Sequence, residues 1–297
     1  MPACVWLPRR GRIGALAERV PLLREVLGRA TRLADAAAGS AALLAGAFSG
    51  LGERIPEAAL TRRFDVPGDH GGRWLRADPC HLRVEASGVR MLACGSGLGL
   101  AREESAAFAQ ALQPLFDEAG WRFDGSHPER WYLQPPAEHP VLGGAAPEQV
   151  LGAFVDAGLA MGDAGRATRQ WLNAAQMVLH AHPLQAQRRG RGLAEVNSVW
   201  LHGDGVAPAQ LRSPSTLVCS RDPLLLGCAD AASVRVAELP VATEREWLLD
   251  ARDALASAPA LQEVLAWRRP LLLQLESGER FHWRPVHRWR FWRLEPA

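Results

Sequence analysis

The segment from Asn197 to Gly205 combines polar side chains with a short apolar run and two glycines. Asn197 lies at the start of the apolar run, and His202 and Asp204 lie at its end. The run predicts a buried strand, and Gly203-Asp204-Gly205 predicts a turn that follows it. Because glycine lacks a Cβ atom, the backbone N–H groups of such a turn can approach an anion closely. A turn that only leads the chain out of a sheet explains the same residues.

A polar stripe lies on the helix predicted from Gly165 to His180. Asn173, Gln176 and His180 share one face, because they are separated by three and four positions. Such uncharged groups can line a pocket or bond to backbone at a packed interface. Asn173 and Asn197 are the only asparagines of the chain, which favours a specific hydrogen-bonding role for each.

Two shorter clusters are candidates for binding a metal or an anion. Asp78 and His81 lie at a predicted strand start, and at this spacing they can share a metal ion or act as an acid–base pair. A strand start at Pro79 with an Asp turn is the alternative. His127 and Arg130 lie in a predicted turn between strands, where they can bind an anionic ligand or form a structural ion pair.

Two motifs give little support for nucleotide or nucleic-acid binding. The loop Gly95-Ser96-Gly97-Leu98-Gly99 has Leu100 where the dinucleotide fingerprint needs its third glycine, so a flexible turn and helix cap fit better. The stretch Arg280 to Arg293 interleaves arginine with aromatic residues, as single-strand-binding surfaces do. As a strand, it would place Trp289 and Phe291 toward a core and the arginines in solvent.

The composition excludes several classes of chemistry. All 34 basic residues are arginine, so no reaction that needs lysine, such as Schiff-base formation, is available. A formal net charge of +2 gives no reason to expect nucleic acid or an anionic membrane as a partner.

The cysteines and apolar segments indicate a cytoplasmic protein. The five cysteines are odd in number and none forms a Cys-x-x-Cys pair, which favours a reducing compartment. The N-terminus lacks a signal-peptide pattern. The uncharged stretch Ala36 to Gly52 is too short and too weakly apolar for a membrane span.

The pattern of elements predicts a mixed α/β protein with a central mixed sheet, flanking helices and an antiparallel C-terminal hairpin. Residues 1–70 are expected to be helical, residues 71–135 to form an α+β part with a hairpin, and residues 148–297 to form an α/β part. Pro135 to Pro147 is the expected connector, and the three parts can also form one continuous domain.

The helical spacing of Phe108, Leu112 and Phe116 predicts a helix from Arg102 to Ala119, and another helix is predicted from Pro223 to Ala232. Trp74 to Cys94 alternates as two strands of a hairpin about Ser87-Gly88. Two helices are predicted between Thr243 and Trp267, and a final strand from Phe281 to Leu294.

Several sequence blocks together resemble the bacterial RpfE-type regulatory proteins, which are similar to archaeal-type cofactor-independent phosphoglycerate mutases. The resemblance covers roughly residues 70 to 235 and rests on Arg76 to Arg83, His127 to Leu133, Trp171 to Met177, His180 to Pro183, Asn197 to Gly205 and Arg221 to Gly227. It implies an alkaline phosphatase-like fold, two metal ions and a serine nucleophile in an Asp-Ser-x-Gly segment. The chain has no Asp-Ser-x-Gly, and its single Asp-His pair, Asp69-His70, lies out of the family's order.

The leading hypothesis is therefore a regulatory or ligand-sensing protein without mutase activity, without a required cofactor, and with a small anionic ligand or a protein as partner. One alternative is a metal-dependent phosphatase or mutase with a divalent ion held by Asp78, His81, His127, His202 and Asp204. A second alternative is an interaction module that uses the Trp/Arg-rich C-terminal hairpin.

Overall fold

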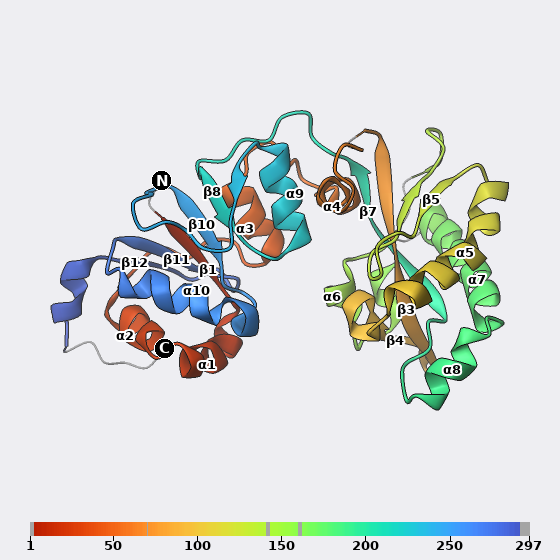
Figure 1. Cartoon of the computed structure of the whole chain (residues 1–297), viewed down its shortest axis with the longest axis horizontal. Coiled ribbons are helices and arrows are strands. Elements are labelled where there is room, and N and C mark those ends of the chain that lie inside the picture. Colours follow the sequence, from red (N-terminus) through yellow and green to blue (C-terminus); the bar gives the residue numbers. More distant parts are fainter. Residues whose placement is uncertain (1–2, 70, 141–142, 160–161, 292–297) are drawn as a thin grey trace. The chain divides into compact units, whose positions relative to one another are not determined.

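A computed structural model describes residues 3–69, 71–140, 143–159 and 162–291. The chain forms two compact units: unit 1 comprises Met1–Glu53 and Pro208–Ala297, and unit 2 comprises Arg54–Ala207. These boundaries differ from the expected division, because the Pro135 to Pro147 connector lies inside unit 2 and the N-terminal segment joins the C-terminal half in one unit. Figure 1 shows both units, with labels on many of their helices and strands.

Unit 1 is built on a seven-stranded mixed sheet in the order β2-β12-β11-β1-β10-β8-β9. Strands β11, β1, β10, β8 and β9 are parallel, and β12 and β2 add antiparallel pairs at one edge. Their bounds are β1 Cys4–Leu7, β2 Thr31–Arg32, β8 Leu217–Cys219, β9 Arg235–Val236, β10 Trp247–Asp250, β11 Leu271–Leu275 and β12 Arg280–Trp283. The central strands are almost entirely apolar, as expected for parallel strands covered on both faces.

The helices of unit 1 bury their apolar faces around this sheet. Helices α1, α2 and α10 contact one another and share a core with β1, β10 and β11 (Figure 1). The helices are α1 Arg10–Arg19, α2 Leu22–Arg29, α3 Ser40–Ala47, α9 Pro223–Ala231 and α10 Ala254–Ala266, with the 3₁₀ turn η3 Pro285–Trp289. Asp222 caps α9 by accepting from the N–H of Leu224, and Asp253 caps α10 by accepting from Leu255 and Ala256.

Unit 2 is built on a five-stranded antiparallel sheet in which β4-β3-β6-β5 are hydrogen-bonded in this order and β7 also pairs with β3. The strands are β3 Arg73–Glu85, β4 Gly88–Cys94, β5 Arg122–Asp124, β6 Tyr132–Gln134 and β7 Ser198–Val206. The helices are α4 Glu57–Asp65, α5 Arg102–Glu118, α6 Pro147–Val150, α7 Gly162–His180 and α8 Leu184–Gly190, with the 3₁₀ turns η1 Gly95–Leu98 and η2 Val155–Gly158.

The two faces of the unit 2 sheet differ in chemistry. Because side chains alternate along a strand, Leu75 and Ala77 of β3 join the apolar core that includes residues of α5 and α7. Arg76 and Asp78 point to the opposite face, where α4 packs on β3 and β7. This second face carries the polar network described below.

The predicted Gly203-Asp204-Gly205 turn is wrong, because β7 continues through these residues to Val206. Gly203 has φ 68°, and the pairing of β7 with β3 shifts register between Trp74 and Arg76. The glycines form an irregular point in the strand on which the start of α4 packs. An added Cβ at either glycine would meet the start of α4, so both glycines serve helix packing.

Of the other helices and strands predicted from the sequence, some are confirmed and some are wrong. The β3–β4 hairpin and helices α5, α7 and α9 are confirmed within a few residues. Strand β1 was not predicted, and β10 lies where a helix was expected. The final strand ends at Trp283, and η3 follows it, so Trp289 and Phe291 are exposed (61% and 66%) and do not face the core. The remainder of that predicted strand, from Trp292 onward, lies outside the described residues, as does His70.

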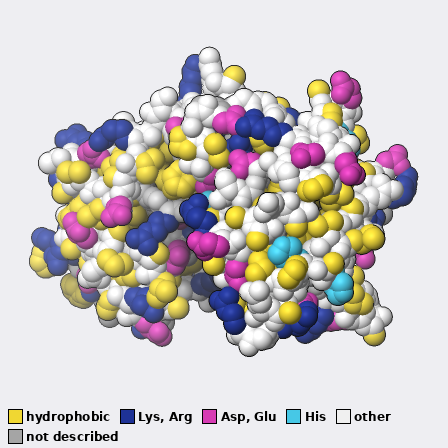
Figure 2. Space-filling view, turned by 45° about the vertical axis from the view of Figure 1, so that its right-hand side comes forward, with side chains coloured by type: hydrophobic (Ala, Val, Ile, Leu, Met, Phe, Trp, Pro, Cys, Tyr) yellow, Lys and Arg dark blue, Asp and Glu magenta, His cyan; other side chains and the backbone are white. Residues whose placement is uncertain are grey.

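The charged side chains on the surface are of both signs, in keeping with the small formal net charge of +2. Arginine and acidic side chains are interspersed over the face shown in Figure 2. Within the described residues, no helix has the length and apolar character needed to cross a membrane.

Candidate functional site

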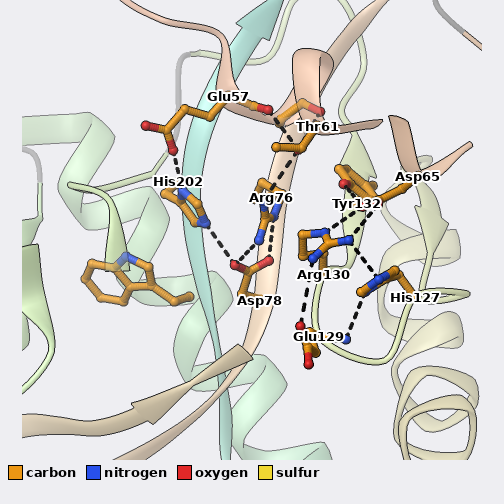
Figure 3. A network of polar contacts seen from close by, with 12 residues as sticks. Glu57, Thr61, Asp65, Arg76, Asp78, His127, Glu129, Arg130, Tyr132 and His202 are labelled. Carbon is orange, nitrogen blue, oxygen red and sulfur yellow. Dashed lines mark hydrogen bonds and ion pairs between the residues drawn. The ribbon is translucent and has the colours of Figure 1, made fainter. Parts of the chain in front are cut away.

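A buried polar network covers the face of the unit 2 sheet beneath α4 (Figure 3). Arg76 of β3 lies opposite His202 of β7 in the strand register, and Asp78 follows two residues later on the same face. Each of the three residues is at most 9% exposed. The strand register therefore brings together two candidate residues from the sequence, Asp78 and His202, with Arg76, which was not among the candidates.

Arg76 and Asp78 form a two-pronged ion pair. Arg76 Nε lies 2.7 Å from Asp78 Oδ1, and Arg76 Nη2 lies 2.5 Å from Asp78 Oδ2. Burial alone raises the pKa of Asp78, but the charges of Arg76 and His202 and their hydrogen bonds outweigh it, so the pKa is lowered. Asp78 is therefore an ionised, fully partnered carboxylate and is poorly suited to act as a general acid.

His202 lies between two carboxylates. Its Nε2 is 3.1 Å from Asp78 Oδ2, and its Nδ1 is 3.2 Å from Oε2 of Glu57, the first residue of α4. Burial favours the neutral ring, but the charge and hydrogen bond of Asp78 and the hydrogen bond of Glu57 raise the pKa of His202 overall. Glu57 was not expected from the sequence, because it is 145 positions away and in a different element.

A second group of polar residues extends the network toward β6. Arg130 donates from Nε and Nη2 to the two oxygens of Asp65 at 2.7 and 2.6 Å, and Tyr132 donates to the same carboxylate. His127 Nε2 lies 2.8 Å from Arg130 Nη2. Burial and the charge of Arg130 lower the pKa of His127. The predicted residues His127 and Arg130 therefore belong to an ion-paired structural turn. Arg130 pairs with Asp65, and His127 contacts Arg130.

The remaining predicted residues lie apart from this network and make structural contacts. Both amide atoms of Asn197 bond to the backbone of Leu82, with Oδ1 accepting at 2.8 Å and Nδ2 donating at 2.7 Å. His81 Nδ1 lies 3.0 Å from the carbonyl oxygen of Glu195. Asp204 forms a two-pronged pair with Arg73.

The predicted polar stripe on α7 does not line a buried site. Asn173 and His180 are exposed, and Gln176 is half-buried. The helix buries the opposite side, through residues such as Leu172, Ala175 and Leu179. The specific hydrogen-bonding role expected from the rarity of asparagine is present at Asn197. For Asn173 it stays a prediction.

The structure does not gather the five residues proposed for a metal site. Of Asp78, His81, His127, His202 and Asp204, only Asp78 and His202 contact each other, and arginines pair with Asp78, His127 and Asp204. In the described part of the chain, no cluster of three or more His, Cys, Asp or Glu side chains could hold a metal ion.

A second polar cluster, the strand-edge cluster of unit 1, was missed in the sequence. It consists of Ser40, Ser220, Asp222, Asp250, Arg252 and Glu276, which follow or end β8, β10 and β11 or begin α3. The carboxyl ends of parallel strands are where α/β proteins bind ligands. In the sequence, a few polar residues follow each of these apolar runs, and this pattern could have indicated the cluster. It was not recognised because the segment that forms β10 was predicted to be helical.

Arg252 lies at the centre of the strand-edge cluster. Its Nη2 is 2.7 Å from Asp222 Oδ2 and 2.7 Å from Asp250 Oδ2, and its Nη1 is 3.2 Å from the Ser40 hydroxyl. The Ser40 hydroxyl donates to Glu276 at 2.6 Å, and Ser220 donates to Asp250 at 2.9 Å. Burial alone lowers the pKa of Arg252, but the two carboxylates raise it overall, so the guanidinium stays charged.

Comparisons with known proteins give structural likeness only. No protein-family model matches the chain, and no curated protein sequence matches it. A cofactor-independent phosphoglycerate mutase from Thermoplasma acidophilum DSM 1728 is 16% identical with a TM-score of 0.39, over 96% of this chain and 90% of that one. The PH0037 protein from Pyrococcus horikoshii is 13% identical with a TM-score of 0.46, over 95% of this chain and 86% of that one.

Proposed function

We propose that this chain is a regulatory or ligand-sensing protein, related to phosphoglycerate mutases but without their activity. The observation that carries the proposal is the position of Arg252 between Asp222 and Asp250. Two carboxylates at the carboxyl edge of a parallel sheet are a natural site for a divalent cation. Here a side-chain cation lies between them.

The contacts of Arg252 make it a strong competitor for a metal ion. The side chain is 14% exposed and the side chain of Asp250 is 7% exposed, so solvent weakens their pairing little. A divalent cation that used both carboxylates would have to displace the guanidinium and leave its donors without partners. This argument favours the non-catalytic function over the metal-dependent phosphatase or mutase.

We propose that the ligand binds at the strand-edge cluster and that it is a small anion. The unit 2 network is less suited, because Arg76, Asp78 and His202 are buried and bonded to one another. At the strand-edge cluster, the Asp222 side chain is 32% exposed, and Arg9, which is 67% exposed, lies 3.1 Å from Glu276. An anion can recruit Arg9 by replacing the carboxylate of Glu276 as its partner.

The test combines turnover with binding on the full chain. We expect no turnover of 3-phosphoglycerate with Mn²⁺ or Mg²⁺, and a rise in melting temperature with 3-phosphoglycerate or inorganic phosphate that Arg9→Ala removes. Arg269→Ala, which changes an exposed arginine of the same unit, is the matched control. Metal-dependent turnover that Asp250→Asn abolishes would overturn the proposal.

A second candidate function is protein interaction through the C-terminal segment. Val286, Trp289 and Phe291 are 61–66% exposed, and the Arg288 guanidinium lies 4.9 Å from the Trp289 ring centre. Exposed aromatic residues beside arginine are typical of interaction surfaces. Pull-down with Trp289→Ala/Phe291→Ala tests this function, and unchanged recovery of partners would count against it.

A further inference from the structure

We propose that Glu57, His202 and Asp78 form a pH-sensitive clamp that holds helix α4 on the sheet of unit 2. Glu57 is the first residue of α4, Asp78 belongs to β3, and His202 belongs to β7. The imidazole therefore joins a helix to two neighbouring strands (Figure 3). The proposal does not depend on the function proposed above.

The geometry fits a doubly protonated ring between two ionised carboxylates. Both ring nitrogens lie against carboxylate oxygens, at 3.2 Å to Glu57 and 3.1 Å to Asp78. A neutral imidazole carries one N–H, so one nitrogen lone pair would face a carboxylate lone pair. Only the imidazolium donates to both partners, and it also balances one of the two buried negative charges.

The surrounding charges determine the pH at which His202 loses its proton and the clamp is released. The charged groups that face the imidazole are Glu57 from α4 and Asp78 and Arg76 from β3, and the pKa of His202 is raised on balance. On β7 itself, Asp204 is paired with Arg73. Because the folded-state pKa is above the unfolded value, the stabilisation is complete below the unfolded pKa of about 6.5 and is lost as pH rises through the folded pKa.

Loss of the proton acts on α4 through the side chain of Glu57, the first residue of this helix. The Glu57 side chain contacts the His202 ring at 3.2 Å. The pKa of Glu57 is lowered: burial raises it, but the hydrogen bond and charge of His202 outweigh burial. Once the His202 ring is neutral, it can donate to only one of the two carboxylates. The other carboxylate, of Glu57 or Asp78, then loses its hydrogen bond from His202 in a partly or fully buried position. Glu57 is the one that can turn to water, because its side chain is 27% exposed and that of Asp78 is 4% exposed.

Histidine NMR and amide hydrogen exchange on the full chain test the clamp. We expect the His202 ring signal to titrate above the unfolded value of about 6.5, with a chemical shift typical of imidazolium at neutral pH. We also expect protection of the α4 amides to fall relative to that of the α5 amides over the same pH range, by about tenfold for each unit of pKa elevation. Comparing the α4 amides with the α5 amides at each pH cancels the intrinsic acceleration of amide exchange by base, which affects both helices.

Variants make the test specific. Glu57→Gln should move the His202 titration to lower pH, and His202→Gln should remove the pH dependence of the α4-to-α5 ratio. His180→Gln, at an exposed position of α7, should change neither. A His202 signal that titrates at or below the unfolded value, or a ratio that stays constant with pH in the wild type, would overturn the proposal even if His202→Gln fails to fold.

Discussion

Gly203 of β7 lies directly against Glu57 of α4. A Cβ atom added to Gly203 would be 2.9 Å from the Glu57 Cβ and 3.1 Å from the backbone nitrogen of Ala58. At Gly205 the added atom would be 2.7 Å from the Cβ of Pro56. The two glycines thus allow the start of α4 to approach the sheet closely enough for Glu57 to reach His202.

Gly203→Ala should therefore destabilise the protein for two separate reasons. Its φ of 68° is costly for a residue with a Cβ, and the new atom would come too close to the Glu57 Cβ at the start of α4. Together these effects predict a loss of about 2–4 kcal/mol of unfolding free energy, measured by urea denaturation. Gly99→Ala is the control, because Gly99 has φ 57° but an added Cβ meets nothing within 4 Å, so only about 1–2 kcal/mol should be lost there. Equal losses for the two variants would contradict close packing at Gly203.

The two asparagines of the chain should respond differently to alanine. Asn197→Ala removes both hydrogen bonds to Leu82 and should lower the unfolding free energy by about 1–3 kcal/mol. Asn173→Ala changes an exposed side chain and should stay within about 0.5 kcal/mol of the wild type. Denaturant midpoints of both variants check this, and a comparable loss for Asn173→Ala would mean that α7 uses its exposed face.

Removing Arg252 should convert the strand-edge cluster into a cation site. Arg252→Ala leaves Asp222 and Asp250 without their shared partner, which should cost about 2–4 kcal/mol, less than for a fully buried pair because Asp222 is 32% exposed. Mn²⁺ should then raise the melting temperature of the variant more than that of the wild type, because carboxylate oxygens suit hard cations. Arg269→Ala should show neither effect, and an equal response to Mn²⁺ in all three proteins would argue against the site.

Stability should also fall in acid, partly through Asp65. Burial raises its pKa, but the hydrogen bonds from Arg130 and Tyr132 and the charge of Arg130 lower it overall. A carboxylate whose folded pKa lies below the unfolded value of about 3.9 stabilises the fold above that value, and this stabilisation is lost as pH falls through the folded pKa. Asp65→Asn should therefore flatten the acid limb of a plot of stability against pH. Asp163→Asn, whose side chain is 91% exposed, should leave the limb unchanged.

The sequence by itself determined the local elements and the class of the fold. The helical spacing of Phe108, Leu112 and Phe116 defined α5, and the alternation after Trp74 defined the β3–β4 hairpin. These features follow from periodicity, which depends on residues within a few positions of one another.

Only the tertiary structure decided which polar residues meet. Glu57 and His202 are 145 positions apart, and Arg252 and Ser40 are 212 apart. Their contacts depend on strand register and on how helices pack on the sheets, which no local pattern encodes. For the same reason Cys4–Leu7, a four-residue apolar run, was not recognised as a central strand: its pairing partners, β10 and β11, come more than 200 residues later.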